Sequence, residues 1–329
     1  MWNRNRTVKV VSTFAGLGGS SFGYTDAGHE VVGAVEFQAD IAAVYRLNHP
    51  VTDCWTVNVR DITGADLRHR FGDFDLLDGS PPCQAFSLMG VKGKERTAIR
   101  RHTDLSYQRS DDLIFDWTRL VQEARPEYAV MENVAVLAGP KWRKYLVPLL
   151  VQLKAAGYRI EVTVLQAELL GNPSTRTRLV IIASRQALKP YRWPTKQPPA
   201  ASTVLPGHGL VIRTGSERKY AFRSLALPAP AVTATGLGFG ARHHSALIDD
   251  SIEVDPVFNE RLIRPWQGEA IRAGRFRQMR MLTIDEVRRL MSFPVLVWPS
   301  GITHLRAWAM IGNSVPPVLS QVVIDRIAA

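Results

Sequence analysis

The first half of the chain alternates between short apolar runs and stretches with helical spacing. Residues 8–14 (VKVVSTF) and 30–36 (EVVGAVE) are rich in β-branched side chains, and residues 38–49 have the spacing of a helix. Continuous apolar runs are typical of strands that helices cover on both faces. Similar runs occupy residues 73–79, 127–133 and 178–184. The pattern predicts an α/β fold built on a parallel sheet.

The pattern changes after this part of the chain. Residues 185–279 include proline-rich and glycine-rich stretches with poor periodicity, which predicts a loop-rich or short-stranded region. Helical spacing returns at residues 280–294, where Thr283 and Glu286 form a capping-box pattern. We therefore expect two domains: residues 1–184 completed by residues 280–329, and a smaller one of residues 185–279.

The net charge of the chain indicates what kind of partner to expect. The chain has 41 Lys and Arg against 30 Asp and Glu, a net charge of +11. Residues 185–280 alone hold 15 basic and 7 acidic residues. A separate basic segment favours contact with nucleic acid over a merely solvated surface.

Composition restricts the remaining classes of protein. Two cysteines cannot build a disulfide framework or a four-cysteine zinc site, which indicates a reducing compartment. No apolar run approaches the roughly 20 residues of a membrane helix. We expect a cytoplasmic protein without a metal.

A glycine-rich turn follows the first predicted strand and opens a helix. Such a turn lets a ligand approach the backbone, and the helix N-terminus favours negative charge. Gly16 and Gly18 are followed by Ser21 where a nicotinamide-type fingerprint has its third glycine, which disfavours an oxidoreductase. Glu36 ends the next strand, in the position of a ribose-binding carboxylate. The alternative is a tight turn without a ligand.

Cys83 lies in the sequence DGSPPCQAFS at residues 78–87. It follows a predicted strand, at the sheet edge where open α/β folds bind ligands. Pro81 and Pro82 restrict the backbone before it, so the thiol is held in place. Cys54, in contrast, has the surroundings of an ordinary core residue. We interpret Cys83 as a nucleophile.

Five motifs in this order resemble those of the carbon-5 cytosine-specific DNA methyltransferases of bacteria and phages. They are FAGLGG (14–19), GSPPCQAFS (79–87), ENV (132–134), RTR (176–178) and GNSVPP (312–317). One departure is Ser174, which replaces a glutamine of the family pattern. The resemblance implies a Rossmann-like S-adenosylmethionine-dependent methyltransferase domain with a smaller, loop-rich target-recognition domain.

The resemblance also implies the catalytic roles. The Cys83 thiolate would attack carbon 6 of cytosine, and Glu132 would bind ring nitrogen 3 and the exocyclic amine. Arg176 and Arg178 alternate on one side of a strand, and both would point into the pocket to orient the base and favour the thiolate. On their own, two surface arginines would be the simpler explanation.

Further residues match cofactor and DNA positions of the family. The cofactor set is Phe14, Ala15, Gly16, Leu17, Gly18, Gly19, Glu36, Phe37, Asp61, Ile62, Pro82, Leu113, Asn313 and Ser314. The DNA set is Gln84, together with Ser87, Lys92, Lys94 and Arg96 of a segment (87–112) that would close over the flipped base. Arg242, His243 and His244 are assigned neither to base reading nor to a metal.

Two other functions stay open at this point. A related family methylates transfer RNA with the same motifs, and a degenerate scaffold would bind DNA without catalysis. The basic segment favours DNA, and the intact Cys83 and Glu132 favour an enzyme. We expect a monomer acting on double-stranded DNA, with or without a cognate restriction endonuclease acting separately.

Overall fold

The computed structural model divides into two compact units. It describes residues 7–82, 100–101, 107–108, 112–206, 209–214, 219–234, 236–237, 246–248, 266–267 and 279–328. The first unit contains residues 1–165, 177–193 and 319–329, and the second contains residues 166–176 and 194–318. Residues 280–318 thus group with the second unit, whereas the sequence predicts that they complete the first domain. The functional division of the chain stays a prediction.

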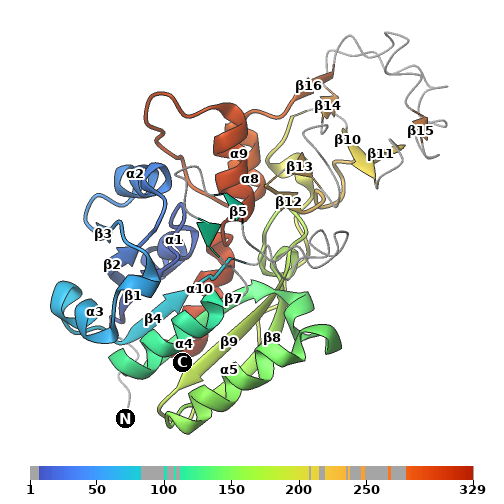
Figure 1. Ribbon diagram of the computed structural model, residues 1–329. Coiled ribbons are helices and arrows are strands. Elements are labelled where there is room, and N and C mark those ends of the chain that lie inside the picture. The colour runs from blue at the N-terminus through green and yellow to red at the C-terminus, as the bar shows by residue number, and fades with distance from the viewer. Residues whose placement is uncertain are drawn as a thin grey trace. The chain divides into compact units, whose positions relative to one another are not determined.

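The first unit is built on a seven-stranded sheet of order β3-β2-β1-β4-β7-β9-β8 (Figure 1). Its strands are β1 (Lys9–Thr13), β2 (Glu30–Val35), β3 (Asp53–Trp55), β4 (Leu76–Gly79), β7 (Tyr128–Val134), β8 (Arg159–Gln166) and β9 (Thr177–Ser184). The predicted strands are therefore confirmed. β3, β2, β1, β4 and β7 are parallel, as expected.

The last predicted strand departs from the parallel arrangement. β9 runs antiparallel to β7, with Glu132 opposite Val180 and Val134 opposite Arg178. Only ten residues separate β8 from β9, and a parallel crossover needs a dozen or more. The chain therefore turns back at this edge of the sheet.

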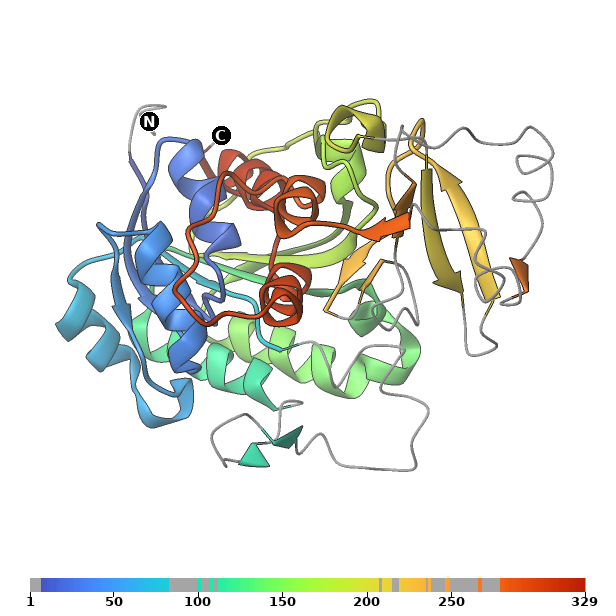
Figure 2. The ribbon, with the colours of Figure 1, turned by 90° about the horizontal axis from the view of Figure 1, so that it is seen from above.

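Helices cover both faces of this sheet (Figure 2). They are α1 (Gly19–Asp26), α2 (Ala39–Asn48), α3 (Gly64–Phe71), α4 (Leu113–Ala124), α5 (Arg143–Ala155) and α10 (Pro317–Ala328). The main core packs side chains of α3, α4 and α5, such as Leu67 and Trp117, against inward positions such as Val35. Its neighbour on the strand, Ala34, packs instead with Tyr45 of α2. Alternate strand residues thus bury opposite faces.

Short elements connect these parts of the first unit. They are the 3₁₀ helices η1 (Val59–Asp61), η3 (Ala135–Ala138) and η4 (Pro140–Trp142), and the paired strands β5 (Arg100–Arg101) and β6 (Tyr107–Gln108). η1 precedes α3, and η3 and η4 join β7 to α5.

The second unit holds short antiparallel strands, as the broken periodicity predicts. Its five-stranded sheet, of order β15-β11-β10-β14-β16, consists of β10 (Gly209–Thr214), β11 (Lys219–Ser224), β14 (Ala246–Ile248), β15 (Trp266–Gln267) and β16 (Met279–Met281). The other elements are the hairpin β12 (Val232–Thr233) and β13 (Gly236–Leu237), the 3₁₀ helices η5 (Ala167–Leu170) and η6 (Ala201–Thr203), and α8 (Ile284–Leu290) and α9 (His304–Asn313). The capping box of Thr283 and Glu286 is confirmed at the start of α8.

One segment among the described residues, His304–Ala328, is apolar and long enough by composition to cross a membrane. It is 78% buried inside the protein over its most apolar window, as is common for core helices.

Candidate active site

The glycine turn between β1 and α1 is held by the end of β2. The Gly16 amide donates to Glu36 Oε2 at 2.9 Å, and the Gln38 amide donates to Glu36 Oε1 at 2.8 Å. Burial raises the pKa of Glu36, whereas backbone hydrogen bonds from Gln38, Gly16 and Phe37 lower it. A carboxylate has about four acceptor sites, so Glu36 is able to accept a further hydrogen bond from a ligand hydroxyl group.

Three residues of the turn, Phe14, Gly16 and Gly18, have positive φ. Phe14 has φ 54°, which is rare for a bulky residue, and Gly18 has φ 82°. A Cβ atom on Gly18 would lie 2.0 Å from His49 Nε2, so only glycine fits there. Strained conformations of this kind gather at ligand sites. The turn therefore has the features of a ligand cradle.

His49 supports this turn and was not predicted from the sequence. Its ring packs 4.2 Å from the Phe22 ring and 4.4 Å from the Tyr45 ring, measured between centroids. Burial lowers the pKa of His49 to about 4, so the imidazole is neutral at pH 7. Nothing in the local sequence pattern distinguishes this histidine from a surface one.

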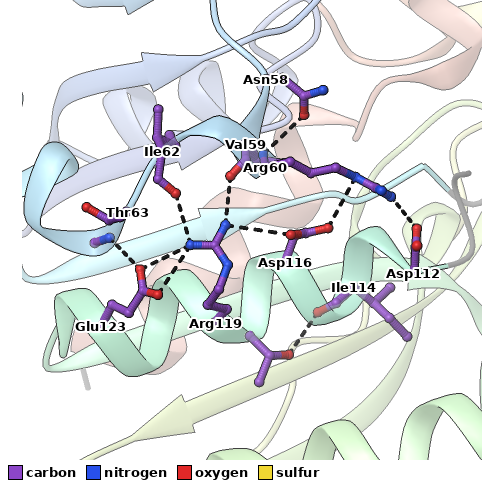
Figure 3. Close-up of polar contacts among 12 residues, drawn as sticks. Asn58, Val59, Arg60, Ile62, Thr63, Asp112, Ile114, Asp116, Arg119 and Glu123 are labelled. Carbon is purple, nitrogen blue, oxygen red and sulfur yellow. Dashed lines mark hydrogen bonds and ion pairs between the residues drawn. The ribbon is translucent and has the colours of Figure 1, made fainter. Parts of the chain in front are cut away.

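Three further cofactor candidates of the first unit lie on η1, directly after it, and on α4. Asp61 is exposed at the end of η1, and Ile62 follows it and is buried. Leu113 is the first residue of α4 and is buried. Arg119 of α4 donates to the carbonyl oxygens of Val59 and Ile62 at 2.9 Å each, which ties these elements together (Figure 3).

Four other cofactor candidates lie elsewhere, two in the first unit and two in the second. Phe37 and Pro82 are half-buried in the first unit. Asn313 ends α9 in the second unit, and Ser314 caps that helix by donating to the Met310 carbonyl at 2.8 Å.

Glu132 and Arg178 form an ion pair at the carboxyl end of β7. Arg178 Nε lies 2.7 Å from Glu132 Oε1, and their side chains are only 15% and 11% exposed. The antiparallel register of β7 and β9 brings the two residues together. A carboxyl group and a guanidinium group thus meet in a nearly buried site, where electrostatic interactions are stronger than in water.

Asn133 connects this pair to the segment that leads to Cys83. Its buried side chain donates from Nδ2 to the Pro81 carbonyl oxygen at 3.2 Å. Cys83 itself lies outside the described residues, as do Gln84, Ser87, Lys92, Lys94, Arg96 and Arg242 to His244. Asn133 was not assigned a role from the sequence, although it stands within the ENV motif.

Arg176 has partners of a different kind from those of Arg178. Its guanidinium donates to the backbone carbonyls of Val232 (3.0 Å), Gly312 (3.1 Å) and Ser314 (2.7 Å), all in the second unit. These bonds hold three distant segments of that unit together. The expected role of Arg176 beside the base stays a prediction.

Ser174 is fully buried where the family pattern has glutamine. Its hydroxyl donates to the Leu290 carbonyl at 2.7 Å and accepts from Asn172 Nδ2 at 3.0 Å. Ser174 thus bonds entirely within the second unit.

A further buried carboxyl group, that of Asp78, lies on β4 before Gly79. Asp78 accepts hydrogen bonds from Tyr24 Oη at 2.8 Å and from Ser12 Oγ at 2.9 Å. Burial raises the pKa of Asp78 to about 6, and the charge of Glu132 adds to this rise.

The titration of Asp78 makes the stability of the protein depend on pH. The ordinary pKa of this group is 3.8, so the folded state holds the proton more tightly than the unfolded chain. Its contribution to the free energy of unfolding is therefore fully present below about pH 4 and falls by about 3 kcal/mol as the pH rises to about 6. In urea unfolding at pH 4 and pH 7, Asp78→Asn should remove this fall. Asp73→Asn, at a fully exposed carboxylate, should keep it.

The chain matches one protein family over nearly its whole length. The family model described as C-5 cytosine-specific DNA methylase matches residues 8–329. The Type II methyltransferase M.XorII of Xanthomonas oryzae pv. oryzae is 32% identical over 202 residues, 59% of this chain and 44% of that protein. M.DdeI of Desulfomicrobium norvegicum is 25% identical over 98% of this chain and 88% of its own. The chain spans about half the length of the first curated relatives that it matches.

Solved structures share the fold at low sequence identity. A mutant of DNMT2 from Spodoptera frugiperda superposes with a TM-score of 0.73 at 18% identity, covering 98% of this chain and 99% of that one. A putative DNA modification methyltransferase encoded in an Escherichia coli prophage gives a TM-score of 0.64 at 18% identity, covering 98% of each chain.

Proposed function

Because the chain belongs to the C-5 cytosine-specific DNA methylase family, we propose that it methylates carbon 5 of cytosine within a short sequence of double-stranded DNA. The observation that carries this proposal is the buried pair of Glu132 and Arg178, joined through Asn133 to the Pro81–Pro82 segment that precedes Cys83. The pair places a carboxyl group and a guanidinium group where a base would react.

We further propose S-adenosylmethionine as the methyl donor. Only glycine fits at position 18 of the glycine turn, so the backbone there is open to a close approach by a ligand. The Glu36 carboxylate beside the turn has an unused acceptor site, which fits a ligand that carries ribose hydroxyls. S-adenosylmethionine, when bound, supplies an electrophilic methyl group.

The residues of the chain would prepare cytosine for that transfer. The Cys83 thiolate attacks carbon 6 of the flipped base, which breaks the ring's aromaticity and raises the electron density at carbon 5. Glu132 forms hydrogen bonds with ring nitrogen 3 and the exocyclic amine, and these bonds orient the base and stabilise the charge that develops on it. After methylation, the carbon-5 proton passes to water, the double bond between carbon 5 and carbon 6 forms again, and the Cys83 thiolate leaves.

We assign residues 1–184 and 280–329 to catalysis and residues 185–279 to target recognition. The short strands and basic composition of residues 185–279 support a surface that reads DNA. We also propose that the protein acts as a monomer in the cytoplasm of a bacterial or phage-infected cell, with or without a cognate endonuclease.

The proposal is tested with purified protein, radiolabelled S-adenosylmethionine, duplex DNA and total transfer RNA. We expect label on DNA only, and base-resolution mapping should place it on carbon 5 of cytosine in one short motif. Label on transfer RNA alone would contradict the DNA substrate, and binding of DNA without any transfer would contradict an enzyme.

The cofactor site gives a separate prediction for Gly18→Ala. The added methyl group would collide with His49, and an alanine at position 18 would have an unfavourable positive φ. S-adenosylmethionine should therefore bind at least about tenfold more weakly. Isothermal titration calorimetry measures this change. Gly28→Ala is the matched control, because Gly28 has φ 84° but nothing within 4 Å of the added atom. Equal affinity in both variants would show that the cofactor does not use this turn.

A further inference from the structure

The surface where β7 leads into α5 is strongly basic. Residues 133–160 contain five Lys or Arg and not one Asp or Glu. Lys141 lies in η4, and Arg143 and Lys144 open α5; all three are exposed. We call these three residues the α5 basic surface.

The stability of the helix does not explain this arrangement. The N-terminus of a helix carries a partial positive charge, so cations there are unfavourable and acidic residues are preferred. α5 has no acidic residue in its first turn and no side-chain cap at Trp142. Arg143 and Lys144 therefore occupy the wrong end of the helix for its own stability.

Acidic side chains of the adjacent helix do not neutralise the α5 basic surface. α4 packs beside α5 and carries Asp116 and Glu123. Figure 3 shows both turned toward the η1 side, where Asp116 pairs with Arg60 and Glu123 pairs with Arg119. Within the part of the chain that the structure describes, none of Lys141, Arg143 and Lys144 has an acidic residue within ion-pair distance.

Aromatic rings contact two of the three cations, Lys141 and Lys144. Lys141 Nζ lies 4.9 Å from the centroid of the Trp142 ring, and Lys144 Nζ lies 5.3 Å from that of Tyr145. Tyr145 in turn stacks on Phe115 of α4, with centroids 6.4 Å apart. Contacts of this kind order the side chains without neutralising them.

The position of this surface indicates its partner. η3 begins directly after Val134, so the α5 basic surface follows, within the first unit, the carboxyl end of the strand that carries Glu132. Any duplex whose cytosine reaches Glu132 brings its phosphates to this edge of the sheet. Exposed cations without acidic partners complement those phosphates.

We propose that the α5 basic surface binds the phosphate backbone of the DNA substrate beside the target cytosine. This inference rests on the proposed function. Because phosphate contacts position the duplex without reading its sequence, the surface sets affinity and leaves the methylated motif unchanged.

A matched pair of double variants tests the proposal. Arg143→Ala/Lys144→Ala removes one Arg and one Lys from the surface. Lys154→Ala/Arg159→Ala makes the same change in charge at exposed positions near the other end of α5, roughly 16 Å along the helix. The affinity for a 30-base-pair duplex is measured at several salt concentrations, with thermal unfolding as the check on folding.

We expect the first variant to lower the slope of log K against log salt by about two units, whereas the second keeps the wild-type slope. The affinity deficit of the first variant should then shrink roughly tenfold between 50 and 200 mM salt. Equal slopes in the two variants would overturn the inference while leaving the proposed function intact. A wild type that transfers no methyl group to DNA would overturn the proposed function, and this inference with it.

Discussion

Replacing Cys83 by alanine is expected to lower methyl transfer to DNA by at least about a thousandfold, because removal of a covalent nucleophile typically has effects of this size or larger. Without the thiolate, carbon 5 of cytosine keeps its aromatic character and is a poor acceptor for a methyl group. Transfer of radiolabel under single-turnover conditions measures the loss. The binding of DNA and of S-adenosylmethionine should change little, since the reaction loses only its covalent step.

The second cysteine of the chain provides the control. Cys54 is buried, and burial raises the pKa of its thiol to about 11, so it is protonated at neutral pH. Cys54→Ala should therefore retain activity. DNA carrying 5-fluorocytosine adds a direct test, because fluorine replaces the proton whose loss releases the enzyme. A covalent complex that forms with Cys54→Ala but not with Cys83→Ala is expected, and the reverse would contradict the assignment.

Much of the first unit follows from the sequence because its strands are buried on both faces. β1, β2, β4 and β7 each appear as an apolar run, since helices cover both sides of them. β8 is different: it lies at the sheet edge, and its buried, half-buried and exposed residues form no continuous apolar run. The antiparallel direction of β9 depends on how the chain turns after β8, which hydrophobic pattern alone does not encode.

The candidate site was also only partly predictable from the sequence. Glu36 was singled out because it ends a recognisable strand, and Glu132 because it stands in the ENV motif of the family. The structure gives the contacts of both residues, and their roles stay predictions. The three carbonyl partners of Arg176 were not found, because they lie 56 to 138 residues away in the sequence. The contacts of Asn133 and His49 are also long-range, and they depend on packing that a single sequence does not display.

Glu132→Gln is expected to lower the rate of methyl transfer by about 10²- to 10⁴-fold, the range typical of losing a positioned carboxyl group in general acid–base catalysis. Glutamine keeps the shape of the side chain, but it has no charge with which to bind the exocyclic amine of the base and to stabilise its reacting form. The same change leaves the nearly buried Arg178 without its anionic partner, and it should destabilise the fold by roughly 2–3 kcal/mol. Single-turnover rates and urea unfolding measure the two effects separately.

A double variant distinguishes chemistry from stability in this pair. In Glu132→Gln/Arg178→Gln the uncompensated charge is removed, so the free energy of unfolding should recover most of its loss, whereas the transfer rate should not recover. Such non-additivity in stability alone is what a double-mutant cycle detects between two contacting residues. If the rate recovered together with the stability, Glu132 would serve the fold rather than the reaction. Persistent inactivity in a well-folded double variant would leave orientation of the base and charge stabilisation at the base as the function of this pair.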